Sequence, residues 1–168
     1  DVLHLYAIAM DGREYYLTEF VDYQRKGLFH KYRIIVVDGE PYIRHLYFSE
    51  NWMIHRKSSK IYQDLYPKEQ AEAIQLLENF HHRLKPQILT QISCIYHELK
   101  LDYFGVDCDI LADGRLLIFE ANATMTTLLN YDKSPNHFDK PISILKNAIE
   151  AMILNRINST NLEKQNND

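Results

Sequence analysis

The chain has 168 residues, of which 46% are hydrophobic and 25% are charged, a composition typical of one globular domain with a substantial core. A net charge of −4 at pH 7 gives no reason to expect nucleic acid or an anionic membrane as a partner. No run is long and apolar enough to span a bilayer, and Cys94 and Cys108 lack metal-ligand spacing. We therefore expect a reduced, cytoplasmic protein that binds neither nucleic acid nor membrane.

The two ends of the chain carry no motif. Residues 1–13 contain no initiator methionine, and we interpret them as a truncated lead-in from a longer protein. Residues 158–168 are almost entirely polar, which favours a disordered tail. Residues 14–157 are then the folded domain.

Three strands are predicted in the first third of the chain. Residues 14–21 are rich in Tyr, Phe and Val, and residues 31–37 and 41–48 flank Asp38-Gly39, a strong hairpin signal. With a two-residue loop, Arg33 lies opposite Arg44. Two arginines on one sheet face suit a polyphosphate, which bidentate contacts bind well, although both side chains pointing into water is an equally ordinary arrangement.

Residues 49–60 lack a clear period and are predicted to form a loop. We expect this loop to pack Trp52 and to leave His55, Arg56 and Lys57 outside, where they could meet an acidic substrate. Apolar residues at helical spacing predict three helices, beginning near Pro67, near Pro86 and near Asp139.

The stretch from Phe104 to Met125 predicts a second hairpin, because Asp113-Gly114 separates two apolar runs. With a two-residue loop, Asp107 lies directly opposite Glu120. The face with this acidic pair would also carry Asp109, Leu111, Leu116, Ile118 and Asn122. The opposite face would be the core face, formed by Val106, Cys108, Ile110, Leu117, Phe119 and Ala121.

This order of strands and helices predicts an α+β fold, an antiparallel β-sheet of hairpins with helices packed on one face. Like charges directly opposite each other destabilise a sheet, so the acidic pair needs compensation. A shared proton, a nearby Lys or Arg, or a hard divalent cation bound by Asp107, Glu120 and the Asn122 amide would each provide it. An all-oxygen set suits Mg²⁺ or Mn²⁺, while acids that simply point into water are the plain alternative.

The sequence from Asp107 through the DG turn to IFEANATM resembles the closing signature of ATP-grasp enzymes, and its spacing is similar to that of the D-alanine–D-alanine ligases. YYLTEFVD resembles the strand that ends at the adenine-binding hinge of that family. KYRIIVVDGEPYIRHLYF resembles the hairpin that follows it. The similarity covers residues 14 to about 154.

The resemblance implies a role for each matching residue. Asp107, Glu120 and Asn122 would bind Mg²⁺ ions that bridge the ATP phosphates, with Asp109 supporting them. Arg33 and Arg44 would approach the phosphates or an acyl-phosphate intermediate. The cofactor-binding residues would be Glu19, Phe20, Val21, Asp22 and Lys31.

The resemblance also implies an activity, in which ATP activates a carboxylate substrate and an amine acceptor then attacks it. The early residues contain no glycine-rich loop, so the chain resembles the C-terminal portion of the ATP-grasp module, which we expect to be inactive without its missing N-terminal part. A non-catalytic module that binds nucleotide or peptide is the main alternative. A hydrolase with paired carboxylates is weaker, because directly opposed acids lie closer than that chemistry requires.

Overall fold

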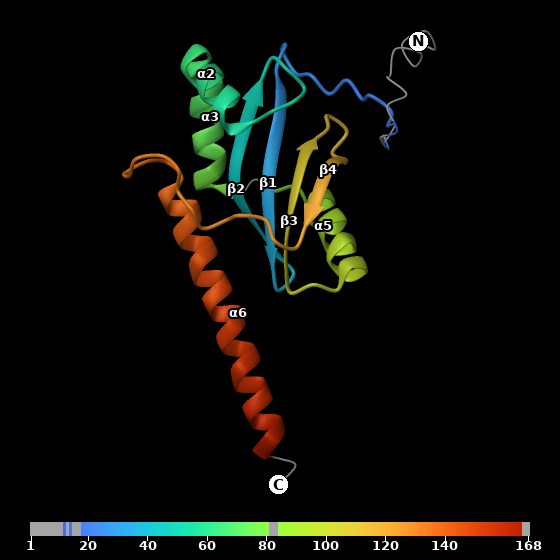
Figure 1. Ribbon diagram of the computed structural model, residues 1–168, viewed down its shortest axis with the longest axis vertical. Coiled ribbons are helices and arrows are strands. Elements are labelled where there is room, and N and C mark those ends of the chain that lie inside the picture. The colour runs from blue at the N-terminus through green and yellow to red at the C-terminus, as the bar shows by residue number, and fades with distance from the viewer. Residues whose placement is uncertain (1–11, 13, 15–17, 81–83, 166–168) are drawn as a thin grey trace.

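The computed structural model describes residues 12, 14, 18–80 and 84–165, and these form an α+β fold around a four-stranded antiparallel sheet (Figure 1). The expected fold class is therefore confirmed. The strands are ordered β2-β1-β3-β4, so the first strands of the two hairpins pair in the centre of the sheet. In chain order the elements are β1 (Phe29–Val37), β2 (Glu40–Ser49), α2 (Arg56–Leu65), α3 (Pro67–Glu78), α5 (Pro86–Leu99), β3 (Tyr103–Ile110), β4 (Leu116–Asn122) and α6 (Asp139–Gln165).

The first hairpin has the expected two-residue turn but not the expected register. Asp38 and Gly39 both have positive φ, 52° and 86°, which is the conformation that a type I′ turn requires. The pairing then shifts between Arg33 and Ile34, so that Arg33 lies opposite His45. The predicted Arg33–Arg44 opposition is wrong, because a bulge in β2 inserts Arg44 as an extra residue.

The second hairpin has the expected acidic pair. Asp107 lies opposite Glu120, but a register shift follows it, and Cys108 then pairs with Ile118. Because of this shift, the prediction that Phe119 belongs to the core face is wrong. The Phe119 side chain is 41% exposed, and its ring contacts that of Tyr23 at 5.2 Å.

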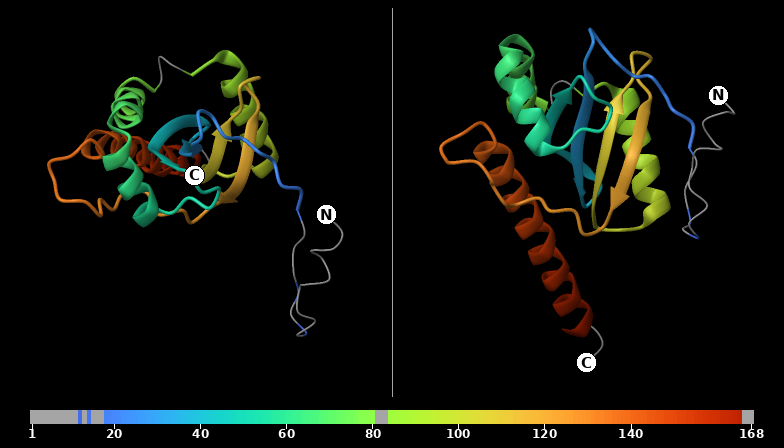
Figure 2. Two further views of the ribbon diagram at one scale, coloured as in Figure 1. Left: turned by 90° about the horizontal axis from the view of Figure 1, so that it is seen from above. Right: turned by 45° about the horizontal axis from the view of Figure 1, so that its top comes forward.

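Apolar side chains cover both faces of the sheet. Ile34 and Val36 belong to a core cluster that includes residues of α3 and α5, namely Leu77, Ile88 and Ile92. Ile35 and Val37 point the other way and pack with Met125, Leu145 and the partly buried Ile149. The last helix, α6, therefore packs on the face opposite to α3 and α5, and our expectation of helices on one face is wrong for α6. Its C-terminal part extends past the end of the sheet (Figure 2).

Two helical segments were not expected. Residues 56–65 form α2 where a loop was predicted, and the first turn is closed by a backbone hydrogen bond from Ser59 to His55 and by the Ser58 hydroxyl, which accepts from the His55 amide. The α6 helix continues through residues 158–165, which we had assigned to a disordered tail. A helix needs no apolar partner at every turn, so polar composition did not end it.

The described residues of the first predicted strand, Glu14 and residues 18–21, are not in a strand, and the rest of that prediction lies outside the described residues. Phe20 is 64% exposed there, so the aromatic pattern did not indicate burial in the sheet. In the described ranges, no helix combines the length and the apolar character that crossing a membrane would require.

Candidate functional site

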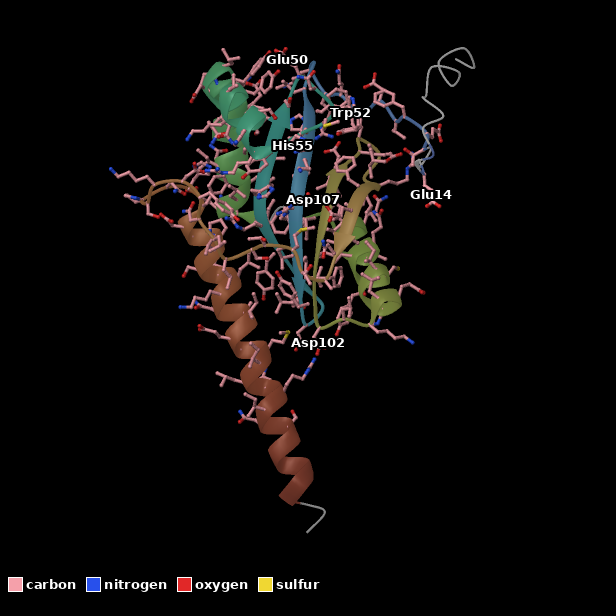
Figure 3. The ribbon with its side chains drawn as sticks, viewed as in Figure 1. Glu14, Glu50, Trp52, His55, Asp102 and Asp107 are labelled. Atoms are coloured by element: carbon pink, nitrogen blue, oxygen red, sulfur yellow. The ribbon has the colours of Figure 1, made fainter. Side chains whose placement is uncertain are left out.

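A cavity of about 660 Å³ lies where three parts of the chain meet beside the strands β3 and β4. The segment from Thr18 to Tyr23 forms one wall, the loop from Trp52 to Ile54 another, and the stretch from Leu117 to Glu120 a third. Lys31 and Asp107 complete the lining. Figure 3 labels Trp52 and Asp107, which come from the β2–α2 loop and from β3. The lining is thus apolar over most of its extent and charged at Lys31, Asp107, Glu19 and Glu120.

The cavity brings together most of the predicted binding residues. Glu19, Phe20 and Val21 line it although they are not in a strand, and so do Lys31, Asp107 and Glu120. Asp22 does not line it; its carboxylate accepts a hydrogen bond from the Gln24 amide at 3.2 Å. Asn122, Arg33 and Arg44 also lie outside the lining.

Asp107 is buried, and its charge is compensated by two cations. Arg33 donates to both carboxylate oxygens, at 2.7 and 2.8 Å, and the Lys31 ammonium lies 3.4 Å from Oδ2. Burial alone would lower the pKa of Arg33, but the hydrogen bonds to Asp107 outweigh it and raise that pKa. Of the compensations considered for the acidic pair, the structure contains the nearby Lys and Arg.

Glu120 differs from Asp107 because it is exposed. Glu120 accepts a hydrogen bond from the side-chain nitrogen Nδ2 of Asn122 at 3.1 Å. The side-chain oxygen Oδ1 of Asn122 accepts from the backbone N–H and the hydroxyl of Thr124 at 2.8 and 2.9 Å. Among the described residues, no group of three or more His, Cys, Asp or Glu could hold a metal ion. A metal site here therefore depends on Asp107, Glu120 and the Asn122 amide oxygen.

These three residues fit a hard divalent cation in chemical type, since all of them offer oxygen atoms. Each carboxylate oxygen has more than one lone pair, so Asp107 can contact a cation while it accepts from Arg33. Glu120 is exposed at the cavity. When bound, Mg²⁺ would neutralise phosphate oxygens at this edge of the cavity.

Arg44 is buried and is bound to backbone rather than to a carboxylate. Its guanidinium donates to the carbonyls of Thr127 and Leu129 at 2.6 and 2.8 Å and lies over the Phe138 ring. Burial lowers its pKa. In this arrangement Arg44 fixes the chain that follows β4 against β2.

His45 is a buried residue that sequence reasoning did not single out. Its ring stacks on that of Tyr47 at 3.9 Å, and Nε2 is buried without a hydrogen-bond partner. Burial, followed by the charges of Arg33, Arg44 and Lys31, holds the His45 pKa well below its usual value. No sequence signal marked it, because the bulge that places it beside Arg33 is invisible in the alternation pattern.

Asp109 belongs to a separate ion pair. It is fully buried and accepts from both terminal nitrogens of Arg25 at 2.6 and 2.8 Å, and Arg25 also donates to the Ile110 carbonyl. Burial raises the pKa of Asp109 against the opposing effect of Arg25. Asp109 therefore anchors the segment before β1, and our prediction that it supports the Asp107 site is not what its contacts show.

A second cavity, of about 500 Å³, is lined by His55, Arg56, Lys57, Ser58 and Tyr131. His55 and Lys57 are exposed as expected, whereas Arg56 is half-buried and bonds to Asp132 at 2.7 Å. Trp52 does not pack under this loop as predicted, because its side chain is 58% exposed. It lines the first cavity instead.

Comparison with known proteins adds no assignment to this geometry. No family model matches the sequence, and no match was found among curated proteins or solved structures. The case for a function therefore depends on the residues of the cavity.

Proposed function

We propose that this chain is the C-terminal, nucleotide-binding half of an ATP-grasp-type carboxylate–amine ligase that acts in the cytoplasm. ATP would occupy the 660 Å³ cavity, with the adenine among the apolar side chains and the phosphates near Lys31. Mg²⁺ would be held by Asp107, Glu120 and Asn122. The substrate is a molecule with a carboxylate, and the acceptor is an amine.

One observation carries this proposal. Residues that the resemblance assigned to the adenine hinge, Glu19 to Val21, line the same cavity as Lys31, Asp107 and Glu120, although they lie far apart in the sequence. A lining that is apolar at one part and charged at another suits a ligand with a flat base and a charged tail.

The proposed reaction has two steps. A carboxylate oxygen attacks the γ-phosphorus of ATP, the bond to the β,γ-bridging oxygen breaks, and ADP leaves an acyl phosphate. The amine then attacks the acyl carbon, inorganic phosphate leaves with the C–O bond electrons, and the nitrogen loses a proton to solvent. In such a reaction most of the rate enhancement comes from positioning the reactants and neutralising the phosphate charge. Lys31 and the acidic pair would provide this neutralisation, Lys31 directly and the acidic pair through Mg²⁺.

Both arginines that the scheme assigns to the phosphates are already hydrogen-bonded within the protein. Arg33 is bound to Asp107, and Arg44 is bound to two carbonyls. Each guanidinium has five N–H donors and uses two of them in these contacts, but neither arginine lines the cavity. Lys31 makes one ion pair, at 3.4 Å, and its ammonium already lines the cavity. Lys31 is therefore the best placed cation for phosphate.

The Arg33–Asp107 pair also favours a second candidate. Because Asp107 is already neutralised by Arg33 and Lys31, the site is electrostatically complete without a metal ion. A non-catalytic module that binds a nucleotide or a peptide in the same cavity is consistent with this arrangement.

Calorimetric titration of ATP into the protein in its full natural length separates these candidates. We expect binding that requires Mg²⁺ and that weakens at least tenfold in Glu120→Gln, a variant expected to fold because Glu120 is exposed. Glu150→Gln, an exposed residue of α6, is the matched control and should bind as the unmodified protein does. Equal ATP affinity with and without Mg²⁺, unchanged in Glu120→Gln, would favour the binding module, and no ATP binding at all would reject the nucleotide site.

A further inference from the structure

We infer that Tyr23 is the positioning residue of the 660 Å³ cavity, because its side chain joins the three walls that must stay together for a flat ligand to bind. This inference rests on the proposed nucleotide site for its ligand, but the joining of the walls is a property of the protein alone. Tyr23 lies outside every motif that the sequence analysis singled out.

The contacts of Tyr23 reach a different wall in each direction. Its hydroxyl donates to the Trp52 carbonyl at 3.2 Å, which holds the β2–α2 loop. Its ring lies 5.2 Å from that of Phe119 on β4, and it also packs edge-on against Phe29 at 4.8 Å. Tyr23 itself is 9% exposed and belongs to the wall formed by residues 18–23, so one side chain connects all three walls.

The backbone beside Tyr23 is fixed independently of the cavity. Arg25, two residues on, makes its bidentate pair with the fully buried Asp109, and Arg25 and Leu28 exchange backbone hydrogen bonds at 2.9 and 3.1 Å. These contacts attach the segment to β3 and to the start of β1. The backbone that follows Tyr23 is therefore fixed to the sheet. Residues 18–21, which precede it, are exposed and not in a strand.

One residue before Trp52, Asn51 also holds the loop, because its backbone N–H donates to the Ser49 hydroxyl and its side chain donates to the Tyr62 hydroxyl. Trp52 and Met53 are 58% and 53% exposed, and only Ile54 in this part of the loop is buried. Burial raises the pKa of Tyr23 to about 12, so its hydroxyl remains a neutral donor across the physiological range.

The consequence is a division of roles within the cavity. Lys31, Asp107 and Glu120 meet the charged end of a ligand, and Tyr23 meets none of it. By holding Trp52 and Phe119 in place, Tyr23 sets the width of the apolar part. Loss of its hydroxyl should therefore weaken ligands that carry a base and leave the base-free polyphosphate unaffected.

Tyr23→Phe tests this inference, because it removes the hydroxyl and keeps the ring. Trp52 is the only tryptophan in the chain, so its fluorescence reports this loop directly. We expect acrylamide to quench Trp52 more strongly in Tyr23→Phe without any ligand, and the dissociation constant for MgATP to rise about two- to tenfold, the usual effect of one lost hydrogen bond. Magnesium tripolyphosphate should compete against MgATP with an unchanged inhibition constant.

Tyr96→Phe is the matched control, since Tyr96 lies on α5 beside Gly39, away from the cavity lining. Its quenching and affinity should equal those of the unmodified protein. Unchanged Trp52 quenching in Tyr23→Phe would overturn the inference, as would an equal loss of affinity for MgATP and tripolyphosphate. If the unmodified protein binds no ATP, the nucleotide proposal fails, yet the quenching result still decides whether Tyr23 holds the loop.

Discussion

At the scale of single residues, the two buried carboxylates of β3 are compensated by basic side chains. Asp107 is matched by Arg33 and Lys31, and Asp109 by Arg25. Breaking a buried pair by removing one member typically costs about 3–5 kcal/mol, because the other charge is left in a poor environment. These pairs explain how a sheet face can carry acids opposite each other without a bound cation.

Two histidines have no such compensation among the described residues, the half-buried His30 and the buried His45. Burial and the nearby Arg25 charge, opposed only by a hydrogen bond involving the Leu28 backbone, lower the pKa of His30 to about 4. An unfolded histidine titrates near 6.5. Between pH 6.5 and pH 4 the unfolded chain therefore binds a proton that folded His30 does not bind, and stability falls as the pH falls.

We expect His30→Gln to flatten the pH dependence of stability in this window. Urea unfolding at pH 7, 5.5 and 4.5 should show that the unmodified protein loses about 2–3 kcal/mol more on acidification than the variant does. His97→Gln, at an exposed position, is the control and should keep the original slope. Parallel slopes for the unmodified protein and His30→Gln would contradict the assignment.

At the scale of elements, the register of the second hairpin is shifted twice, by its loop and by a bulge, and the two shifts cancel at the acidic pair. A two-residue loop would place Ala112 opposite Arg115, but the structure instead has a backbone hydrogen bond from Gly114 to Leu111 and another from Leu111 to Arg115, with Gly114 at a φ of 84°. This three-residue loop shifts the register by one, and Ile110 lies opposite Leu116. The bulge after Asp107 shifts it back.

The opposition of Asp107 and Glu120 was therefore predicted correctly, while the pairing between them and the turn was not. Apolar alternation and turn residues are visible in a sequence, whereas a bulge adds one residue without a composition of its own. The same limit explains the missed Arg33–His45 pairing. Hence the two hairpins and the acidic pair were predictable, and the neighbours of each arginine were not.

The seam between β3 and the chain after β4 depends on Gly105. A Cβ at this position would lie 2.5 Å from the Met125 sulfur and 2.9 Å from the Ile35 Cδ1 atom. We expect Gly105→Ala to lower the free energy of unfolding by about 1–3 kcal/mol, as overpacking does in a dense core. Chemical denaturation measures the change.

A double-mutant cycle with Met125→Ala provides the control, because the shorter side chain removes the clash with sulfur. Gly105→Ala should cost at least 0.5 kcal/mol less in the Met125→Ala background, by roughly the coupling expected for residues in contact. Additive costs would mean that the strain arises elsewhere.

At the scale of the whole molecule, α6 joins parts of the chain that are distant in sequence. Its inner residues cover Ile35 and Val37 of β1, and Arg156 bonds to Asp38 at 2.6 Å and to Asp102 at 2.9 Å. The helix then runs beyond the sheet (Figure 1). Its helical pattern was predicted from the sequence, but the sheet face that it covers was not. The continuous apolar run from Ile34 to Val37 is typical of a strand buried on both faces, and it was the signal for a second core that the prediction left unused.

Leu145 is the fully buried residue by which α6 docks on the sheet. Its side chain is fully buried against β1, so Leu145→Ala removes apolar contact and leaves a cavity, at a cost of about 2–5 kcal/mol. We expect hydrogen exchange to accelerate in α6 and in β1 together, because each covers the other. Ile144→Ala, whose side chain is 38% exposed, should cost clearly less and leave exchange in β1 unchanged. Faster exchange in α6 alone would show that the second core does not stabilise the sheet, and that the cavity beside β3 and β4 is supported by the α3 and α5 face by itself.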